Sequence, residues 1–387
     1  METFAKILGD TRGDESSATS HTSVTAMIKD ERMMKALVLT SPGAFEVREV
    51  PVPKPGPHEV LCRIHGVAIC GSDPEIIRGG LAGTWPPSYP FIPGHEWSGE
   101  VVEVGDGVLG FKPGDRVAGE AHKGCGYCRN CLQGRYNLCE NYGRPETGHR
   151  HYGFVSQGAY AQYNVYSIRS INHLPQAVSF REGALVDTAG VTLHAMELTG
   201  ITPGGTVVVI GPGPIGLIAA RFAKALGAAR VIVVGRGARL KAAAEKGADA
   251  VVDFEKEEPV KAVLDLTDRL GVDEAFECSG APGTFAQAVR MVRKGGKVAL
   301  LGVPPDKVLE ELPFKYIVHN EIAIFGSRAN PNVSRKIIQM MVAGHIKVKD
   351  LITHTFPLED FAKALDTFVN RRDGVIKVVI EPNGAEA

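Results

Sequence analysis

The chain has 387 residues, which suits two domains better than one, and 44% of them are hydrophobic and 22% charged. Its formal net charge of -1 excludes the bulk attraction to nucleic acid or to an anionic membrane that a strongly basic chain would have. The composition is that of an ordinary globular protein, so neither nucleic acid nor a membrane is an expected partner.

The N-terminal residues differ from the rest of the chain. Residues 1–32 mix acidic and basic side chains without an apolar core, so they do not read as a secretory signal, and residues 16–25 are rich in Ser and Thr. We expect residues 1–33 to be a disordered extension that ends just before a strand-like run at 36–39. No apolar stretch is long enough to span a bilayer, and we expect a cytoplasmic location.

The first third of the chain predicts a β-rich domain. Its short runs of Val and Ile are separated by turn clusters rich in Pro and Gly, such as residues 53–57 and 112–115. The expected strands are residues 46–50, 59–66, 97–104 and 116–118.

From about residue 190, short apolar strands alternate with helices. Continuous apolar strands are buried on both faces, so this alternation predicts a doubly wound parallel sheet of the α/β class. The expected strands are residues 206–210, 230–234, 250–252, 274–277, 297–301 and 322–325, with helices at 215–226 and 238–246. The sequence then predicts two helices, 333–343 and 358–369, and a last strand at 376–380.

Four of the seven cysteines are crowded together as Cys125-x2-Cys128-x2-Cys131-x7-Cys139. Four thiolates so close in sequence can surround one zinc ion tetrahedrally and leave no open position, so the spacing predicts a structural site. An odd cysteine count without a secretory signal argues against disulfides, and the neutral net charge argues against a nucleic-acid-binding zinc module.

A second set of potential ligands is dispersed along the chain. Cys70, His95 with its neighbour Glu96, and Asp187 could supply sulfur, nitrogen and oxygen to a catalytic zinc ion. Such an ion needs three protein ligands and one position open to substrate oxygen. Taken singly, each residue also has an ordinary explanation, such as a core cysteine or a helix-capping aspartate.

A dinucleotide fingerprint follows the strand at 206–210 and opens a helix. It consists of Gly211, Gly213, Pro214, Ile215 and Gly216 around Pro212. Glycines there allow the tight turn and the close approach of a pyrophosphate, which the positive end of the helix faces.

The next strand ends in Gly235-Arg236-Gly237-Ala238-Arg239, without the acid that accepts hydrogen bonds from an adenosine ribose. An acid would repel the 2′-phosphate of NADP, whereas Arg236 and Arg239 could bind it. We therefore favour NADP and keep NAD open, because NAD could bind at Gly235 through backbone contacts alone.

Together these motifs make the chain resemble the zinc-containing medium-chain alcohol dehydrogenases, most closely the sorbitol and threonine dehydrogenase branch. The matching stretches are Gly94-His95-Glu96, Gly114-Asp115-Arg116-Val117, the four-cysteine lobe, Gly158-Ala159-Tyr160-Ala161-Gln162-Tyr163, and Glu277-Cys278-Ser279-Gly280. The resemblance implies hydride transfer between NAD(P) and a small polar secondary alcohol, of polyol, diol or hydroxy-acid type. It also implies two zinc ions per chain and a homodimer or homotetramer, in which the strand near 297–301 or 322–325 meets its mate.

The resemblance also implies a division into domains. The expected parts are the extension at 1–33, a GroES-like catalytic domain at 34–188 with the zinc lobe at 120–145, a Rossmann domain at 189–328, and a return segment at 329–387 that completes the catalytic domain.

Two departures from the branch affect the expected chemistry. Asp187 stands where relatives usually have Glu, and Glu96 can also approach the metal, so either carboxylate is a candidate ligand. Relatives often carry His five residues after the cysteine ligand, where this chain has Glu75. We expect Ser72 to take the alcohol proton and pass it outward toward Glu75.

Arg328 stands at the end of the last strand of the predicted nucleotide domain, where relatives line the active site. It could bind an anionic group of the substrate, and the alternative is a solvated surface position. Two other functions also stay open. A metal-free quinone-type reductase would lack Cys70, His95 and the four-cysteine lobe, and a zinc-binding protein could use its nucleotide domain for sensing or interaction.

Overall fold

The computed structural model describes residues 32–80, 83–304 and 309–385. Residues 1–31 of the predicted extension lie outside these ranges, and the first strand, β1, begins at Met33. Among the described residues, no helix has the length and apolar character that a membrane span requires.

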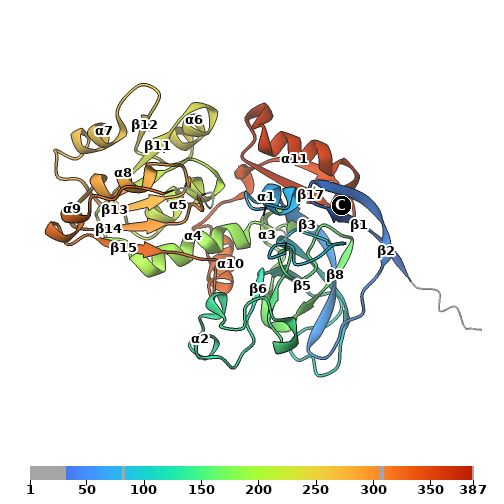
Figure 1. Cartoon of the computed structure of the whole chain (residues 1–387). Coiled ribbons are helices and arrows are strands. Elements are labelled where there is room, and N and C mark those ends of the chain that lie inside the picture. Colours follow the sequence, from blue (N-terminus) through green and yellow to red (C-terminus); the bar gives the residue numbers. More distant parts are fainter. Residues whose placement is uncertain (1–31, 81–82, 305–308, 386–387) are drawn as a thin grey trace, which may run out of the picture. The chain divides into compact units, whose positions relative to one another are not determined.

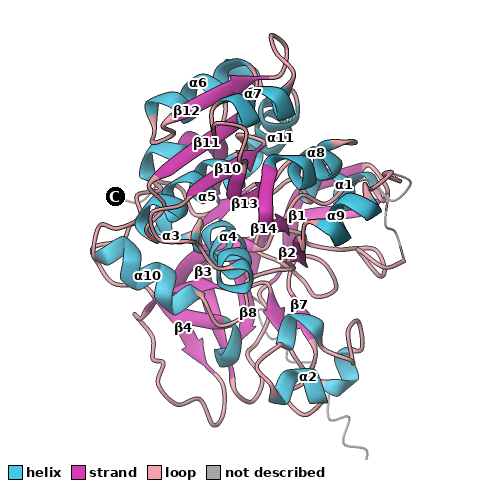
Figure 2. Cartoon of the chain, turned by 90° about the vertical axis from the view of Figure 1, so that its left-hand side faces the viewer, coloured by secondary structure: helices cyan, strands magenta, loops and turns pink. Residues whose placement is uncertain are grey.

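Six strands of the second half form one parallel sheet in the order β12-β11-β10-β13-β14-β15 (Figure 1). Figure 2 shows β12, β11, β10, β13 and β14 following one another in this order. Their bounds are β10 (Thr206–Ile210), β11 (Arg230–Gly235), β12 (Ala250–Asp253), β13 (Val272–Glu277), β14 (Val292–Leu300) and β15 (Ala323–Gly326). The predicted doubly wound sheet is confirmed, and its order reverses between β10 and β13, where such folds bind ligands.

Alternate residues of β10 enter different cores, as a strand buried on both faces requires. Val207 and Val209 pack in the core that includes helices α4 (Val186–Thr199) and α5 (Pro214–Ala225). Val208 and Ile210 pack in another core with α7 and α8. The remaining bounds here are α6 (Gly237–Glu245), α7 (Pro259–Asp265), α8 (Thr284–Met291) and α9 (Phe314–His319).

The first third and the last segment share a second sheet, in the order β16-β17-β3-β4-β5-β9, with β8 also paired to β3. Its strands are β3 (Glu59–Ala68), β4 (Glu96–Val104), β5 (Arg116–Gly119), β8 (Tyr163–Ser167), β9 (Ile171–His173), β16 (Ile352–Pro357) and β17 (Lys377–Glu381). The predicted last strand is β17, which runs antiparallel to β3 and pairs Val379 with Ala68. The last segment therefore joins the sheet formed by strands of the first third of the chain (Figure 1).

Shorter elements surround this sheet. They are β1 (Met33–Ser41) paired with β2 (Ala44–Pro51), β6 (His122–Lys123) paired with β7 (Arg150–His151), and the helices α1 (Asp73–Arg78), α2 (Arg129–Leu132), α3 (Phe180–Gly183), α10 (Ser334–Val342) and α11 (Phe361–Val369). The helix predicted at 358–369 begins with a short 3-10 turn, and α11 itself starts at Phe361.

Candidate metal and cofactor sites

The four cysteines of the lobe come together around one point. Their sulfur atoms all lie within 4.8 Å of one another, with Cys125 3.9 Å from Cys131 and Cys128 4.0 Å from Cys139. Zinc–sulfur bonds of about 2.3 Å in a tetrahedron place the sulfurs about 3.8 Å apart, so this group fits a zinc ion.

Backbone amides of the same loop support negative charge on these sulfurs. The amide of Cys128 donates to the sulfur of Cys125 at 3.4 Å, and the amide of Cys131 donates to the sulfur of Cys128 at 3.5 Å. Burial opposes ionisation of Cys125, but the amide donors outweigh it and lower its pKa to about 6. A thiolate stabilised in this way is the form that binds a metal.

The second candidate group contains Cys70, His95 and Glu96, whose ligand atoms also lie within 4.8 Å of one another. Cys70 follows strand β3, and His95 and Glu96 lie at the start of β4. These two strands are antiparallel, and their register pairs Ala68 with Glu96. Sheet pairing therefore brings together residues that the sequence places about one strand-turn-strand apart.

Asp73 contacts both Cys70 and His95, and no pattern in the sequence indicated this role. It is completely buried and accepts hydrogen bonds from the amide of Cys70 at 2.8 Å and the hydroxyl of Tyr160 at 2.7 Å. Its Oδ1 lies 3.7 Å from Nδ1 of His95. Burial opposes a charge on His95, but Cys70, Asp73 and Glu96 raise its pKa to about 10. This concentration of negative charge suits a cation.

Lys377 of β17 is the second residue that sequence reasoning missed. It is 2% exposed and forms an ion pair with Oε2 of Glu96, which is equally buried. Burial opposes its charge, but Glu96 and Cys70 raise its pKa. A single lysine within the apolar run 375–380 was the available signal, because such a residue is rarely buried without a partner.

Asp187 lies outside this second group. Its Oδ2 accepts hydrogen bonds from Nδ2 of Asn330 at 3.0 Å and from the amide of Ala121 at 3.3 Å. Burial raises its pKa to about 7. The structure thus brings Glu96, rather than Asp187, into contact distance with Cys70 and His95.

The residues expected to relay a proton occupy different environments. The Oγ atom of Ser72 is buried and has no hydrogen-bond partner among the described residues, which suits a group that meets the substrate hydroxyl. Glu75 is exposed and its carboxylate pairs with Arg78. Its backbone amide donates to the carbonyl of Ser72 at 3.1 Å, but among the described residues no hydrogen bond joins its carboxylate to the Ser72 hydroxyl. Arg328 lies with its guanidinium 4.8 Å from the ring centre of Tyr142.

The dinucleotide fingerprint has the geometry of a phosphate-binding turn. Gly211 has a φ of 97°, and a Cβ there would meet Ser279 at 2.8 Å. A Cβ on Gly216 would lie 2.0 Å from the carbonyl oxygen of Gly211, so this glycine is needed for close packing of helix and strand. Gly213 caps α5, whose first residues are Pro214 and Ile215, and a Cβ there would meet nothing within 4 Å. Open space before the N-terminus of a helix fits a pyrophosphate.

Both arginines that follow β11 already have hydrogen-bond partners in this structure. Arg236 donates from Nη1 to Oε1 of Glu255 at 2.8 Å, and Arg239 donates from Nε to the carbonyl of Val375 at 3.1 Å. A Cβ on Gly235 would lie 2.3 Å from the ring of Pro212, so a side chain at this position would displace the fingerprint loop.

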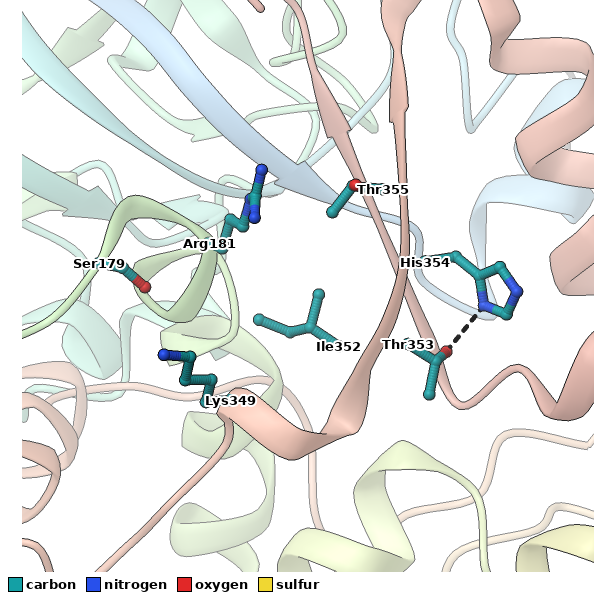
Figure 3. Close-up of a pocket in the computed structure, with 7 residues that line it drawn as sticks. All are labelled: Ser179, Arg181, Lys349, Ile352, Thr353, His354 and Thr355. Atoms are coloured by element: carbon teal, nitrogen blue, oxygen red, sulfur yellow. Dashed lines mark hydrogen bonds between the residues drawn. The ribbon is translucent and has the colours of Figure 1, made fainter. Parts of the chain in front are cut away.

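A cavity of about 490 Å³ lies elsewhere, between the start of α3 and β16 (Figure 3). Ser179, Arg181 and Lys349 line it together with residues 352–355, and Arg181 is paired with Glu381 at 2.7 Å. None of the predicted site residues lines this cavity, so it does not coincide with the candidate chemistry.

Comparison with known proteins points to the same two parts of the chain. Residues 56–176 match the alcohol dehydrogenase GroES-like domain, and residues 214–343 match the zinc-binding dehydrogenase family. Sorbitol dehydrogenase of Bacillus subtilis is 35% identical over 90% of this chain and 98% of its own length.

Two solved structures are similar over nearly the whole chain. A zinc-binding dehydrogenase from Sinorhizobium meliloti 1021 bound to NADP has a TM-score of 0.83 and 33% identity, covering 91% of this chain and 100% of that one. The 2R,3R-butanediol dehydrogenase of Bacillus subtilis has a TM-score of 0.81 and 28% identity, covering 90% of this chain and 100% of its own.

Proposed function

The chain belongs to the family of zinc-dependent medium-chain alcohol dehydrogenases, in the sorbitol and threonine dehydrogenase branch, and we propose how its own residues carry out the reaction. It is an oxidoreductase that transfers a hydride between the CH–OH group of a small polar alcohol and NAD(P). The observation that carries the proposal is the convergence of Cys70, His95 and Glu96 beside the unpartnered hydroxyl of Ser72. The metal-free reductase and the sensing protein are not favoured.

Zinc, when bound, supplies a Lewis acid that makes an alcohol proton more acidic. Cys70 and His95 would hold the ion, with Glu96 as the nearest carboxylate. Asp73 orients His95 and the backbone of Cys70, while Ser72 accepts the proton at its Oγ. The carboxylate of Glu75 is paired with Arg78, so we propose it as the next acceptor only for the proton that Ser72 passes outward.

We propose two zinc ions per chain, one in each group. Elemental analysis of metal-replete protein should find two ions, and Cys70→Ala should remove one ion together with activity. Glu96→Gln and Asp187→Asn separate the candidate carboxylates, because only the variant that loses a ligand should bind zinc about 10- to 100-fold more weakly. A single ion in the unaltered protein would contradict the two-site proposal.

For the cofactor we propose NADP, with Arg236 as the ligand of the 2′-phosphate. Arg236 directly follows β11 and is paired with Glu255, whereas Arg239 donates to the carbonyl of Val375. Arg236→Ala should lower kcat/KM for NADP relative to NAD by about tenfold or more. Glu255→Gln is the matched control, since it frees Arg236 and should shift the ratio toward NADP. A preference for NAD that neither variant alters would overturn the assignment.

The edge of the parallel sheet supports assembly into a homo-oligomer. β14 has strands on both sides, so β15 is the edge available to a second copy. Several large apolar side chains around this edge are exposed, among them Val303, Phe314, Val318 and Ile324. We propose a dimer or tetramer through β15, and sedimentation at working concentration tests it. The location in the cytoplasm and the domain boundaries at residues 33, 188 and 328 stay predictions.

The test of the function is turnover by the zinc-replete protein. Polyols, diols and hydroxy acids are assayed with both cofactors, and Cys70→Ala serves as the inactive control. Hydride transfer from at least one class, lost in the control while the fold is retained, is the expected result. A metal-loaded protein without any such activity would contradict the proposal.

A further inference from the structure

In the described part of the chain, the buried histidines all lie in one region. They are His95, His122, His149 and His151, and only His95 belongs to a potential metal group. Strands β6 and β7 pair His122 directly with His151, and the two rings stack with centres 3.8 Å apart. Three histidines near the candidate metal centre therefore have no role in the reaction as described.

Aromatic contacts connect this cluster to the candidate metal centre. The ring of Phe154 lies 3.9 Å from that of His151 and 4.5 Å from that of His95. Trp85 packs edge-on against Phe154, with ring centres 5.1 Å apart. Phe154 therefore connects the ring of His151 to the ring of His95 through two direct ring contacts.

Tyr142 contacts two histidines of the cluster and also Arg328. Its ring centre is 4.8 Å from that of His149 and 4.8 Å from the guanidinium of Arg328, and its hydroxyl bonds Nδ1 of His151. Trp85 donates from Nε1 to the same hydroxyl at 2.8 Å. An indole nitrogen can only donate, so the tyrosine hydroxyl accepts this bond, and we assign its own proton to the bond with Nδ1 of His151.

These bonds determine which ring nitrogens carry protons. In His151, Nδ1 accepts from Tyr142, so Nε2 holds the proton of the neutral ring. In His149, Nδ1 accepts from the amide of Gly143 at 3.3 Å, so its proton is also on Nε2, which is buried without a partner. Burial and nearby Arg150 and Arg328 lower the pKa of His149 to about 4. Burial also holds the pKa of His151 well below its ordinary value, so both rings are neutral at pH 7, and Nε2 of His149 presents an N–H without an acceptor among the described residues.

Arg328 adds a charge to these donors. It forms no ion pair with any described residue. Burial lowers the pKa of His122 and of His151, and the positive charge of Arg328 lowers both further. The side chains around Tyr142, which are those of His149, His151 and Arg328, therefore present hydrogen-bond donors and one positive charge. A neutral hydroxyl would leave its own proton without an acceptor there, whereas a carboxylate only accepts.

We propose that the substrate alcohol carries a carboxylate, which Arg328 and the Nε2 protons of His149 and His151 bind. The substrates would then be hydroxy acids of the sugar-acid type rather than neutral polyols. One guanidinium beside neutral rings balances the single charge of a carboxylate and not the double charge of a phosphate ester. This inference rests on the proposed function, since it assigns the substrate class of the same site.

The test compares pairs of equal chain length, sorbitol with gluconate and glycerol with glycerate, on the zinc-replete enzyme with both cofactors. We expect kcat/KM to be at least about tenfold higher for the acid in one pair or both. Arg328→Met should reduce that acid-to-polyol ratio by about tenfold or more. Arg335→Met is the matched control, because it removes an exposed arginine of α10 and should leave the ratio unchanged.

Binding gives a second readout that needs no turnover. Trp85 donates a hydrogen bond to Tyr142, so gluconate bound beside Tyr142 should change the fluorescence of Trp85. The other tryptophan, Trp97, is buried against Tyr166. Its Kd should rise at least about tenfold in Arg328→Met.

Three outcomes would overturn the inference: acids that bind no better than polyols, binding that Arg328→Met leaves unaltered, or sorbitol 6-phosphate preferred over gluconate. Acids that bind through Arg328 without any hydride transfer would instead refute the proposed function and leave the inference standing.

Discussion

Replacing Lys377 with Met tests how the centre is held together. Lys377 is 2% exposed and its partner Glu96 is also 2% exposed, so water cannot solvate either charge. Met keeps the length of the side chain and removes the ammonium, which leaves the carboxylate of Glu96 buried without its partner. The perturbation therefore isolates one ion pair with little change in packing.

The expected loss follows from the burial of the pair. Removing one partner of a fully buried ion pair costs about 3–5 kcal/mol, because the remaining charge is neither paired nor hydrated. In an exposed pair such as Lys35 with Glu359, water solvates both charges, so its loss costs far less. Urea unfolding, followed by tryptophan fluorescence, measures the free energy of unfolding of each variant, with the Cys70, His95 and Glu96 group free of metal so that no zinc ion pairs with Glu96.

Two further variants separate the effect of the buried ion pair from the effect of losing a lysine charge. Lys35→Met is the exposed control and should change stability much less than Lys377→Met. The double variant Lys377→Met with Glu96→Gln removes both charges and should recover most of the loss. If Lys377→Met alone destabilises no more than Lys35→Met, the buried pair does not support the centre and the reasoning is refuted.

The remaining predictions concern other sites. Cys131→Ser should lose one zinc ion and lower stability while the other ion stays, as metal analysis and thermal unfolding would show; unchanged zinc content would refute the lobe assignment. Asp350 receives hydrogen bonds from Arg221 and Lys246 that outweigh burial and lower its pKa to about 2. Its stabilising effect is therefore present above about pH 4 and lost as the pH falls toward 2. Asp350→Asn should cost about 1 kcal/mol at pH 7, since the side chain is partly exposed, and the difference from the unaltered protein should shrink below pH 4; a difference independent of pH would contradict this.

The two zinc groups differ in how well the spacing of their residues in the sequence predicts them. The lobe was predictable because all four cysteines fall within residues 125–139, where a short loop has few ways to keep its sulfurs apart. The fingerprint at residues 211–216 was equally local, since a strand, a turn and a helix follow one another there. In the dispersed group, by contrast, the sequence left the choice between Glu96 and Asp187 open.

The sequence by itself determined the α/β class, the parallel sheet, the cysteine lobe and the phosphate turn, because each depends on neighbours within one or two elements. Only the tertiary structure decided which distant side chains meet. Asp187 bonds Asn330 across 143 residues, Lys377 reaches Glu96 because β17 joins the sheet of β3 and β4, and Arg239 is turned to the backbone before β17. Such contacts follow from strand order and packing, which no local pattern of residues encodes.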